Sequence, residues 1–255
     1  MLSDRQNNSL LKTILIRCYA ELNDFLPPDR RQKNFPLSLK MPVTVAEALQ
    51  SIGIPLAEID LVLVNSEPAP LNRRLMDGDQ VSAYPTFESF DISQLKDKLS
   101  PPLRHTQFIL DAHLGKLAKY LRMLGFDTLY RNDFGDEEII DMAADENRII
   151  LTRDKLLLKS PKVSHGYYVR AIEKHEQLNE VVKKFDLVSQ FKTFTRCMTC
   201  NSILLPKKKE EIREKIDEDT ARVFNEFFFC PDCDKVFWKG SHFERMEKLI
   251  LSLLD

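Results

Sequence analysis

The fold is decided by residues 106–155, TQFILDAHLGKLAKYLRMLGFDTLYRNDFGDEEIIDMAADENRIILTRDK. Short apolar runs have the composition of buried strands, and amphipathic segments with leucines or isoleucines at helical spacing separate them. Gly125 is placed to end the first of these helices. The predicted strands are residues 108–110, 126–130, 148–152 and 166–170. This alternation of strands and helices predicts a parallel α/β sheet.

A different pattern precedes this stretch. Its predicted strands are residues 11–17, 35–40, 61–65 and 80–84. Between the second and third, Thr44 and Glu47 form a capping box for a short helix, and Gly53 suits the position just past its end. Two strands, one helix and two more strands is the element order of a β-grasp fold.

The segment LVLVN at 61–65, followed by LMDGDQVSAYP at 75–85, resembles the ubiquitin-like sulfur carriers of the ThiS/MoaD kind. Those carriers act through a free C-terminal Gly-Gly, whereas this chain continues into PTFESF at 85–90. We therefore exclude carrier chemistry and expect a module that docks a protein partner or positions RNA. A purely structural role is the alternative.

The composition is that of a globular protein. The chain has 255 residues, 43% of them hydrophobic and 30% charged, with a net charge of −2, so a nucleic-acid function must rest on local sites. Its first residues show no signal peptide, and no apolar run reaches the ~20 residues of a membrane helix. We expect a cytoplasmic protein with no membrane partner.

Acidic residues follow two of the predicted parallel strands. Asp111 closes the first strand, Asp154 follows the third, and Asp136 or Glu137 opens the helix between them. Sites in open α/β sheets form at the carboxyl ends of strands, and a hard cation such as Mg²⁺ or Mn²⁺ suits gathered carboxylates. Such an ion could serve phosphodiester hydrolysis. The alternative is that these acids are ordinary helix caps and turn residues.

Two CxxC pairs give the strongest signal in the sequence. Cys197 and Cys200 form the first pair, and Cys230 and Cys233 form the second. In a cytosolic chain this spacing indicates a structural zinc site, because four thiolates complete a tetrahedral coordination sphere. The charged insert at 206–219, between the pairs, predicts a helical excursion. Four unlinked thiols are the alternative.

Several motifs in the same order resemble the Mut-seven C-terminal RNase family, a branch of the PIN-like nucleases. They are LDAHLGKLAKYLRMLGFDTLY (110–130), DFGDEEIIDMAADENRIILTRDKLLL (133–158), RCMTCN (196–201) and FFFCPDCDKVFWKGSHFERM (227–246). The resemblance implies that Asp111 and Asp154 are strand-end acids of a nuclease site. The remaining acids of the four-acid PIN pattern would come from Asp133, Asp136, Glu137 or Glu138.

The resemblance also implies a division of the chain. We expect a ubiquitin-like β-grasp domain at 8–90, a linker at 91–103, a PIN-like nuclease domain at 104–192, and a zinc ribbon with a C-terminal helix at 193–255.

Basic and aromatic residues near these motifs are candidates for RNA contacts. They are Lys116, Lys119, Arg122, Arg153 and Trp238. A basic rim beside a metal edge would hold a phosphate backbone, and an exposed indole could stack on a base. A solvated helix face and packing against the ribbon are the alternatives.

Together these features predict a ribonuclease that depends on Mg²⁺ or Mn²⁺ and carries a structural zinc ribbon. A non-catalytic RNA- or protein-binding module with a degenerate site is the alternative, and a DNA nuclease is a third possibility.

Overall fold

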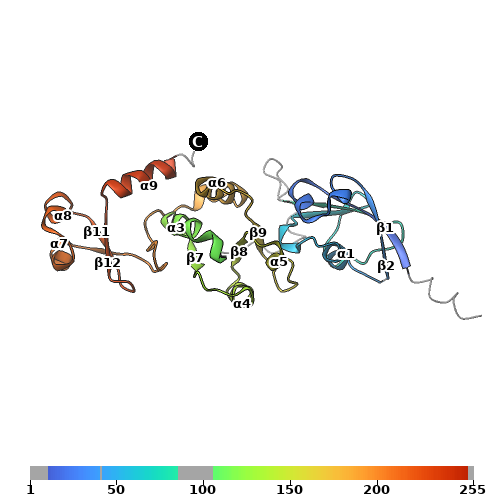
Figure 1. Ribbon diagram of the computed structural model, residues 1–255, viewed down its shortest axis with the longest axis horizontal. Helices are drawn as coiled ribbons and strands as arrows, with labels where there is room; N and C mark the ends of the chain where they lie inside the picture. Colours follow the sequence, from blue (N-terminus) through green and yellow to red (C-terminus); the bar gives the residue numbers. More distant parts are fainter. Residues whose placement is uncertain (1–10, 41, 86–105, 252–255) are drawn as a thin grey trace, which may run out of the picture. The chain divides into compact units, whose positions relative to one another are not determined.

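The computed structural model describes residues 11–40, 42–85 and 106–251 (Figure 1). The chain divides into two compact units. The first combines the N-terminal domain with residues 136–168, and the second combines residues 106–135 with those from 169 onward. The linker predicted at 91–103 lies outside the described residues, and the predicted domain boundaries stay predictions.

Over residues 11–40 and 42–85, the N-terminal domain is a five-stranded mixed sheet with the short α-helix α1 (Val45–Ser51) and three 3₁₀ helices. Its strands are β1 (Leu11–Cys18), β2 (Phe35–Lys40), β3 (Leu61–Val64), β4 (Glu67–Pro68) and β5 (Gln80–Tyr84). Their order is β2-β1-β5-β3-β4, with β1 and β5 parallel and the other pairs antiparallel. This arrangement confirms the predicted β-grasp fold. The two-residue strand β4 was not predicted.

Local chemistry sets the limits of α1. Thr44 Oγ1 accepts a hydrogen bond from the Glu47 amide at 3.2 Å, and Glu47 Oε2 accepts from the Thr44 amide at 2.7 Å, which confirms the capping box. Gly53 follows the helix with φ +84°, a conformation that favours glycine. One face of α1 enters a core built from the strands, through Val45, Ala48 and Leu49.

The remainder of the first unit is the second half of the α/β region. It contains α4 (Asp136–Glu146), β8 (Ile149–Thr152), α5 (Lys155–Leu158) and β9 (Gly166–Tyr168). Strands β8 and β9 are parallel, and Ile150 is in register with Gly166. A Cβ on Gly166 would lie 2.6 Å from Leu158 Cδ2, so the glycine leaves room for this leucine of α5 against β9.

The second unit begins with the first half of the α/β region. This half contains β6 (Gln107–Leu110), the 3₁₀ turn η4 (Ala112–Leu114), α3 (Gly115–Met123) and β7 (Asp127–Tyr130). Helix α6 (Lys174–Lys184), which follows β9 in the sequence, also belongs to the second unit. Strands β6 and β7 are parallel. Because β8 and β9 of the first unit are parallel as well, these elements confirm the predicted parallel α/β sheet.

A small antiparallel sheet with the order β10-β11-β12 follows in the second unit. Its strands are β10 (Leu205–Lys207), β11 (Phe227–Cys230) and β12 (Lys235–Trp238). The insert between β10 and β11 forms α7 (Lys209–Ile212), η6 (Arg213–Lys215) and α8 (Glu218–Val223), which confirms the helical excursion. The last helix is α9 (Ser241–Leu251), drawn in red in Figure 1.

No helix within residues 11–40, 42–85 and 106–251 has both the length and the apolar character needed to cross a bilayer.

Candidate functional site

Asp111 lies at the end of β6, the first strand of the parallel sheet in the sequence. It follows β6 directly and is the N-cap of η4, where its Oδ1 accepts a hydrogen bond from the His113 amide at 2.8 Å. Only 6% of Asp111 is exposed, whereas the His113 side chain is 77% exposed, with Nδ1 3.6 Å from Asp111 Oδ1. The strand and the turn therefore fix the carboxylate in a nearly buried position.

Asp154 occupies the corresponding place after β8. It is the N-cap of α5, and its Oδ1 accepts from the Leu156 amide at 2.7 Å. Its own amide donates to Thr152 Oγ1 at 2.8 Å. These two bonds tie the position of the Asp154 side chain both to the end of β8 and to the start of α5.

Asp136, Glu137 and Glu138 form the acidic first turn of α4, and all three are exposed. Negative side chains are favourable there because the helix N-terminus carries a partial positive charge. Asp133 has a different setting: its Oδ1 is 2.9 Å from Arg131 Nε, and that hydrogen bond lowers the pKa of the carboxyl. In the structure Asp133 therefore forms an ion pair with Arg131.

Asp111 belongs to the second unit, and Asp154, Asp136 and Glu137 belong to the first. Their assembly into one site stays a prediction.

The four cysteines form a candidate metal centre. Among the described residues they are the one group of three or more His, Cys, Asp or Glu whose ligand atoms all lie within 4.8 Å of one another. Cys197 Sγ lies 3.5 Å from Cys233 Sγ, and Cys200 Sγ lies 3.2 Å from Cys230 Sγ and 3.7 Å from Cys233 Sγ. Four sulfurs bound tetrahedrally to one zinc ion lie about 3.8 Å apart, so the geometry fits zinc.

Two matching turns bring the sulfurs together. In the first, the Asn201 amide donates to the Cys197 carbonyl at 2.9 Å, and Asn201 has φ +78°. The second is the turn of the β11–β12 hairpin, where Cys230 is in register with Lys235 and Asp234 has φ +54°. A left-handed residue after the second cysteine reverses the chain, so that both thiols of a pair point to the same side.

The thiols influence one another strongly. Burial raises the pKa of both Cys230 and Cys233. Burial also raises the pKa of Cys200, but hydrogen bonds with Ser202 and the neighbouring cysteines outweigh it and lower that pKa to about 6. Four adjacent thiolates would repel one another, and a bound divalent cation relieves that repulsion. The donor set therefore favours a cation.

Side chains from α3 and β7 hold the first cysteine turn in place. Arg122 is 3% exposed; its Nε donates to the Thr128 carbonyl at 2.9 Å and its Nη1 donates to the Thr199 carbonyl at 2.8 Å. Asn201 Oδ1 accepts from the Thr128 amide at 3.0 Å, and its Nδ2 donates to Asp127 Oδ1 at 2.9 Å. Asn201 was not among the predicted site residues, although an Asn directly after a CxxC pair is a signal for this turn.

The residues predicted to bind RNA have different surroundings. Lys116 and Lys119 are exposed on α3, and the Lys116 ammonium lies 5.0 Å from the Tyr120 ring centroid. Arg153 is partly buried, and Trp238 is 36% exposed at the end of β12. Arg122 is instead buried with its donors used inside the protein, so we leave it out of the proposed RNA surface.

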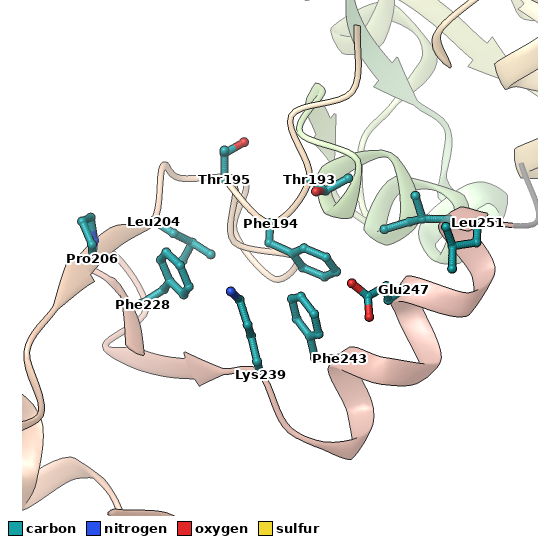
Figure 2. Close-up of a pocket in the computed structure, with 11 residues that line it drawn as sticks. Thr193, Phe194, Thr195, Leu204, Pro206, Phe228, Lys239, Phe243, Glu247 and Leu251 are labelled. Carbon is teal, nitrogen blue, oxygen red and sulfur yellow. The ribbon is translucent and has the colours of Figure 1, made fainter. Parts of the chain in front are cut away.

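A pocket of about 590 Å³ lies between β10–β11 and α9 (Figure 2). Its walls are mainly aromatic and aliphatic, and the Phe194 and Phe243 rings face each other with centroids 4.1 Å apart. Lys239 lies among these side chains in Figure 2, and its Nζ is 2.7 Å from Glu226 Oε2. No motif in the sequence predicted this pocket.

The fold and the cysteine centre define a modular protein: a β-grasp domain, a parallel α/β sheet and a small antiparallel sheet with a four-cysteine metal centre. The chain belongs to the Mut7-C RNAse domain family, which it matches over residues 106–250, more than half of its length. Residues 11–91 match the Mut7-C ubiquitin family.

Comparison with solved structures gives a match to the crystal structure of SAMP1 from Haloferax volcanii, with 16% identity and a TM-score of 0.25. The match covers 31% of this chain and 99% of that chain. No curated protein matches the chain.

Proposed function

We propose that this protein is a metal-dependent ribonuclease that hydrolyses RNA phosphodiester bonds. The observation that carries the proposal is the match of residues 106–250 to the Mut7-C RNAse domain family. The structure supports it locally, because two acids, Asp111 and Asp154, each follow a parallel strand and each cap the element that comes next.

The catalytic ion of the proposal is Mg²⁺ or Mn²⁺, with Asp111 and Asp154 as its ligands. All the proposed ligands are carboxylates, the donor type that these hard cations prefer. When bound, the ion would neutralise the carboxylates and withdraw charge from the scissile phosphate. Asp136 or Glu137, at the start of α4, would complete the site and orient the attacking water.

The other parts of the chain would support this chemistry. The cysteine centre is closed by four protein sulfurs, which is the pattern of a structural zinc ion. We assign Lys116, Lys119 and Arg153 to RNA backbone contacts, and Trp238 to base stacking. The β-grasp domain would position RNA or bind a protein partner.

The test is an RNA cleavage assay with the purified full chain in Mn²⁺ and in Mg²⁺. We expect cleavage by the wild type and none by the double variant Asp111→Asn, Asp154→Asn, because the amides remove two negative ligands without changing side-chain volume. Asp145→Asn, an exposed change in α4, is the matched control and should keep full activity.

The contrary outcomes separate the alternatives. Identical traces for wild type and double variant across metals and substrates would rule out the enzyme and leave an RNA- or protein-binding module. Cleavage of DNA in preference to RNA of the same sequence would make the protein a DNA nuclease.

A further inference from the structure

Within the first unit, the β-grasp domain is bonded to β9 through a buried carboxylate. Glu58, in the 3₁₀ turn η3 (Leu56–Glu58), is 1% exposed, and its Oε1 accepts a hydrogen bond from the Tyr168 amide at the end of β9. The Tyr168 ring packs against the β-grasp core, and it meets the Phe25 ring edge-on with centroids 6.0 Å apart. A carboxylate withdrawn this far from water needs such a donor.

Lys155, the first residue of α5, makes a second attachment at the same place. Its Nζ donates to the Asp24 carbonyl at 2.7 Å. The same ammonium lies 5.5 Å from the Phe25 ring centroid and 5.0 Å from the Tyr168 ring centroid, within the range of cation–π attraction. The lysine thus holds α5 to the 3₁₀ helix η1 (Ala20–Phe25) of the β-grasp domain, which ends in Asp24 and Phe25.

A third contact comes from Lys159, the C-cap residue of α5. Lys159 Nζ is so near Gly53 that a Cβ built on the glycine would lie 3.0 Å from it. Residues 155 and 159 share one face of a helix because they are four positions apart. The first residue of α5 and its C-cap residue therefore both lie against the β-grasp domain.

The attachment bears directly on Asp154. Asp154 is the N-cap of α5, and its Oδ1 accepts a hydrogen bond from the Leu156 amide. Any rotation or shift of α5 moves this amide and therefore moves the Asp154 carboxylate. A side chain that serves as a metal ligand must be held in its productive direction by the groups behind it.

We infer that the β-grasp domain positions the proposed nuclease site, with Lys155 as the positioning residue that fixes α5 and so orients Asp154. The inference rests on the proposed ribonuclease function. Lys155 thereby has a different role from that of its neighbour Arg153. The Lys155 ammonium is hydrogen-bonded to the β-grasp domain, whereas Arg153 stays assigned to RNA.

The first test measures Mn²⁺ dependence of RNA cleavage by the full chain carrying Lys155→Met. Methionine keeps most of the side-chain length and removes the ammonium. We expect the Mn²⁺ concentration for half-maximal rate to rise about tenfold, the lower end of the range for groups behind a metal ligand. RNA affinity, measured without added Mn²⁺ or Mg²⁺, should not change.

Two variants control this result. Lys155→Arg retains a charged donor that can pack on both rings, so it should restore most of the wild-type Mn²⁺ requirement. Lys162→Met removes an exposed lysine of the same unit that pairs with Asp141, and it should leave the Mn²⁺ requirement unchanged. A loss of RNA affinity in Lys155→Met, at an unchanged Mn²⁺ requirement, would make Lys155 an RNA contact and overturn the inference.

The second test does not use activity. Amide hydrogen exchange of Leu156 and Tyr168 in the full chain should accelerate in Lys155→Met, and exchange of Tyr168 should also accelerate in Glu58→Gln, because each change loosens the attachment. Unchanged exchange at both amides together with an unchanged Mn²⁺ requirement would overturn the inference.

If the wild type cleaves no RNA with any metal, the proposed function fails by itself. Exchange at Leu156 then decides alone whether the β-grasp domain holds α5.

Discussion

Gly125 is the glycine of the second unit at which an added Cβ would lie closest to another atom. It ends α3 with φ +98°, and a Cβ there would lie 2.2 Å from the Lys192 carbonyl oxygen. That approach accompanies a bond from the Lys192 amide to the Leu124 carbonyl at 2.9 Å, which brings the chain leading to Cys197 against the end of α3. The sequence predicted that Gly125 ends the helix. The close approach of the Lys192 carbonyl is a second reason why this position requires glycine.

We expect Gly125→Ala to lower the free energy of unfolding by about 2–4 kcal/mol, because the methyl group meets a backbone atom and the positive φ disfavours any side chain. Gly135→Ala is the matched control, since no atom lies within 4 Å of its Cβ position, and it should change stability by less than about 0.5 kcal/mol. Denaturant unfolding of both variants measures the difference. Equal effects would contradict the close approach at Gly125.

At the scale of elements, the cysteine centre and its three short strands depend on each other. Strands β10, β11 and β12 have three or four residues each, and most of their side chains are partly or fully exposed. So small a sheet has little core of its own, and a zinc ion would supply folding free energy. The two cysteine turns are also joined directly, since Ser202 Oγ donates to Asp232 Oδ2.

We expect the purified chain to contain one zinc ion, and Cys230→Ser to lose it. Trp238, the single tryptophan of the chain, lies in β12 and reports on this sheet, so its fluorescence should shift when zinc is lost or chelated. Cys18→Ala is the control: Cys18 is a buried residue of β1, and burial raises the pKa of its thiol to about 12, so it stays protonated.

Elemental analysis of the two variants provides the measurement. Full zinc content in Cys230→Ser, or an equal loss in Cys18→Ala, would contradict a four-sulfur zinc centre.

For the whole molecule, charge is the property that bears on RNA. A net charge of −2 gives no general attraction for a polyanion, so binding must depend on local groups such as the exposed Lys116 and Lys119 of α3. The two lysines are three positions apart on one helix, which places their charges on neighbouring parts of its surface.

We expect the double variant Lys116→Glu, Lys119→Glu to weaken RNA binding and to reduce the slope of log affinity against log salt by about one per lysine. The control is Lys33→Glu with Lys40→Glu, which makes the same change of net charge on exposed positions of the β-grasp domain. Titrations at several salt concentrations supply both quantities. The same loss in both double variants would show that only net charge matters.

The sequence alone determined the elements and the chemistry of the metal centre. Alternating apolar segments, the capping box at Thr44 and the two CxxC pairs depend on neighbours a few residues away, and local periodicity records such relations. The β-grasp order, the parallel sheet and the four-cysteine centre followed from them and agree with the structure. The grouping of Asp111 with Asp154 is still a prediction from that reasoning.

Only the tertiary structure decided where individual long side chains go. Arg122 shares the spacing of the exposed Lys116 and Lys119, yet it is buried against the first cysteine turn, about 77 positions along the chain. Lys155 stands beside Asp154 in sequence, but its ammonium is bonded to a carbonyl at Asp24. The physical reason is that the partner of a flexible charged side chain is supplied by whichever distant segment packs beside it, and no local pattern encodes that segment.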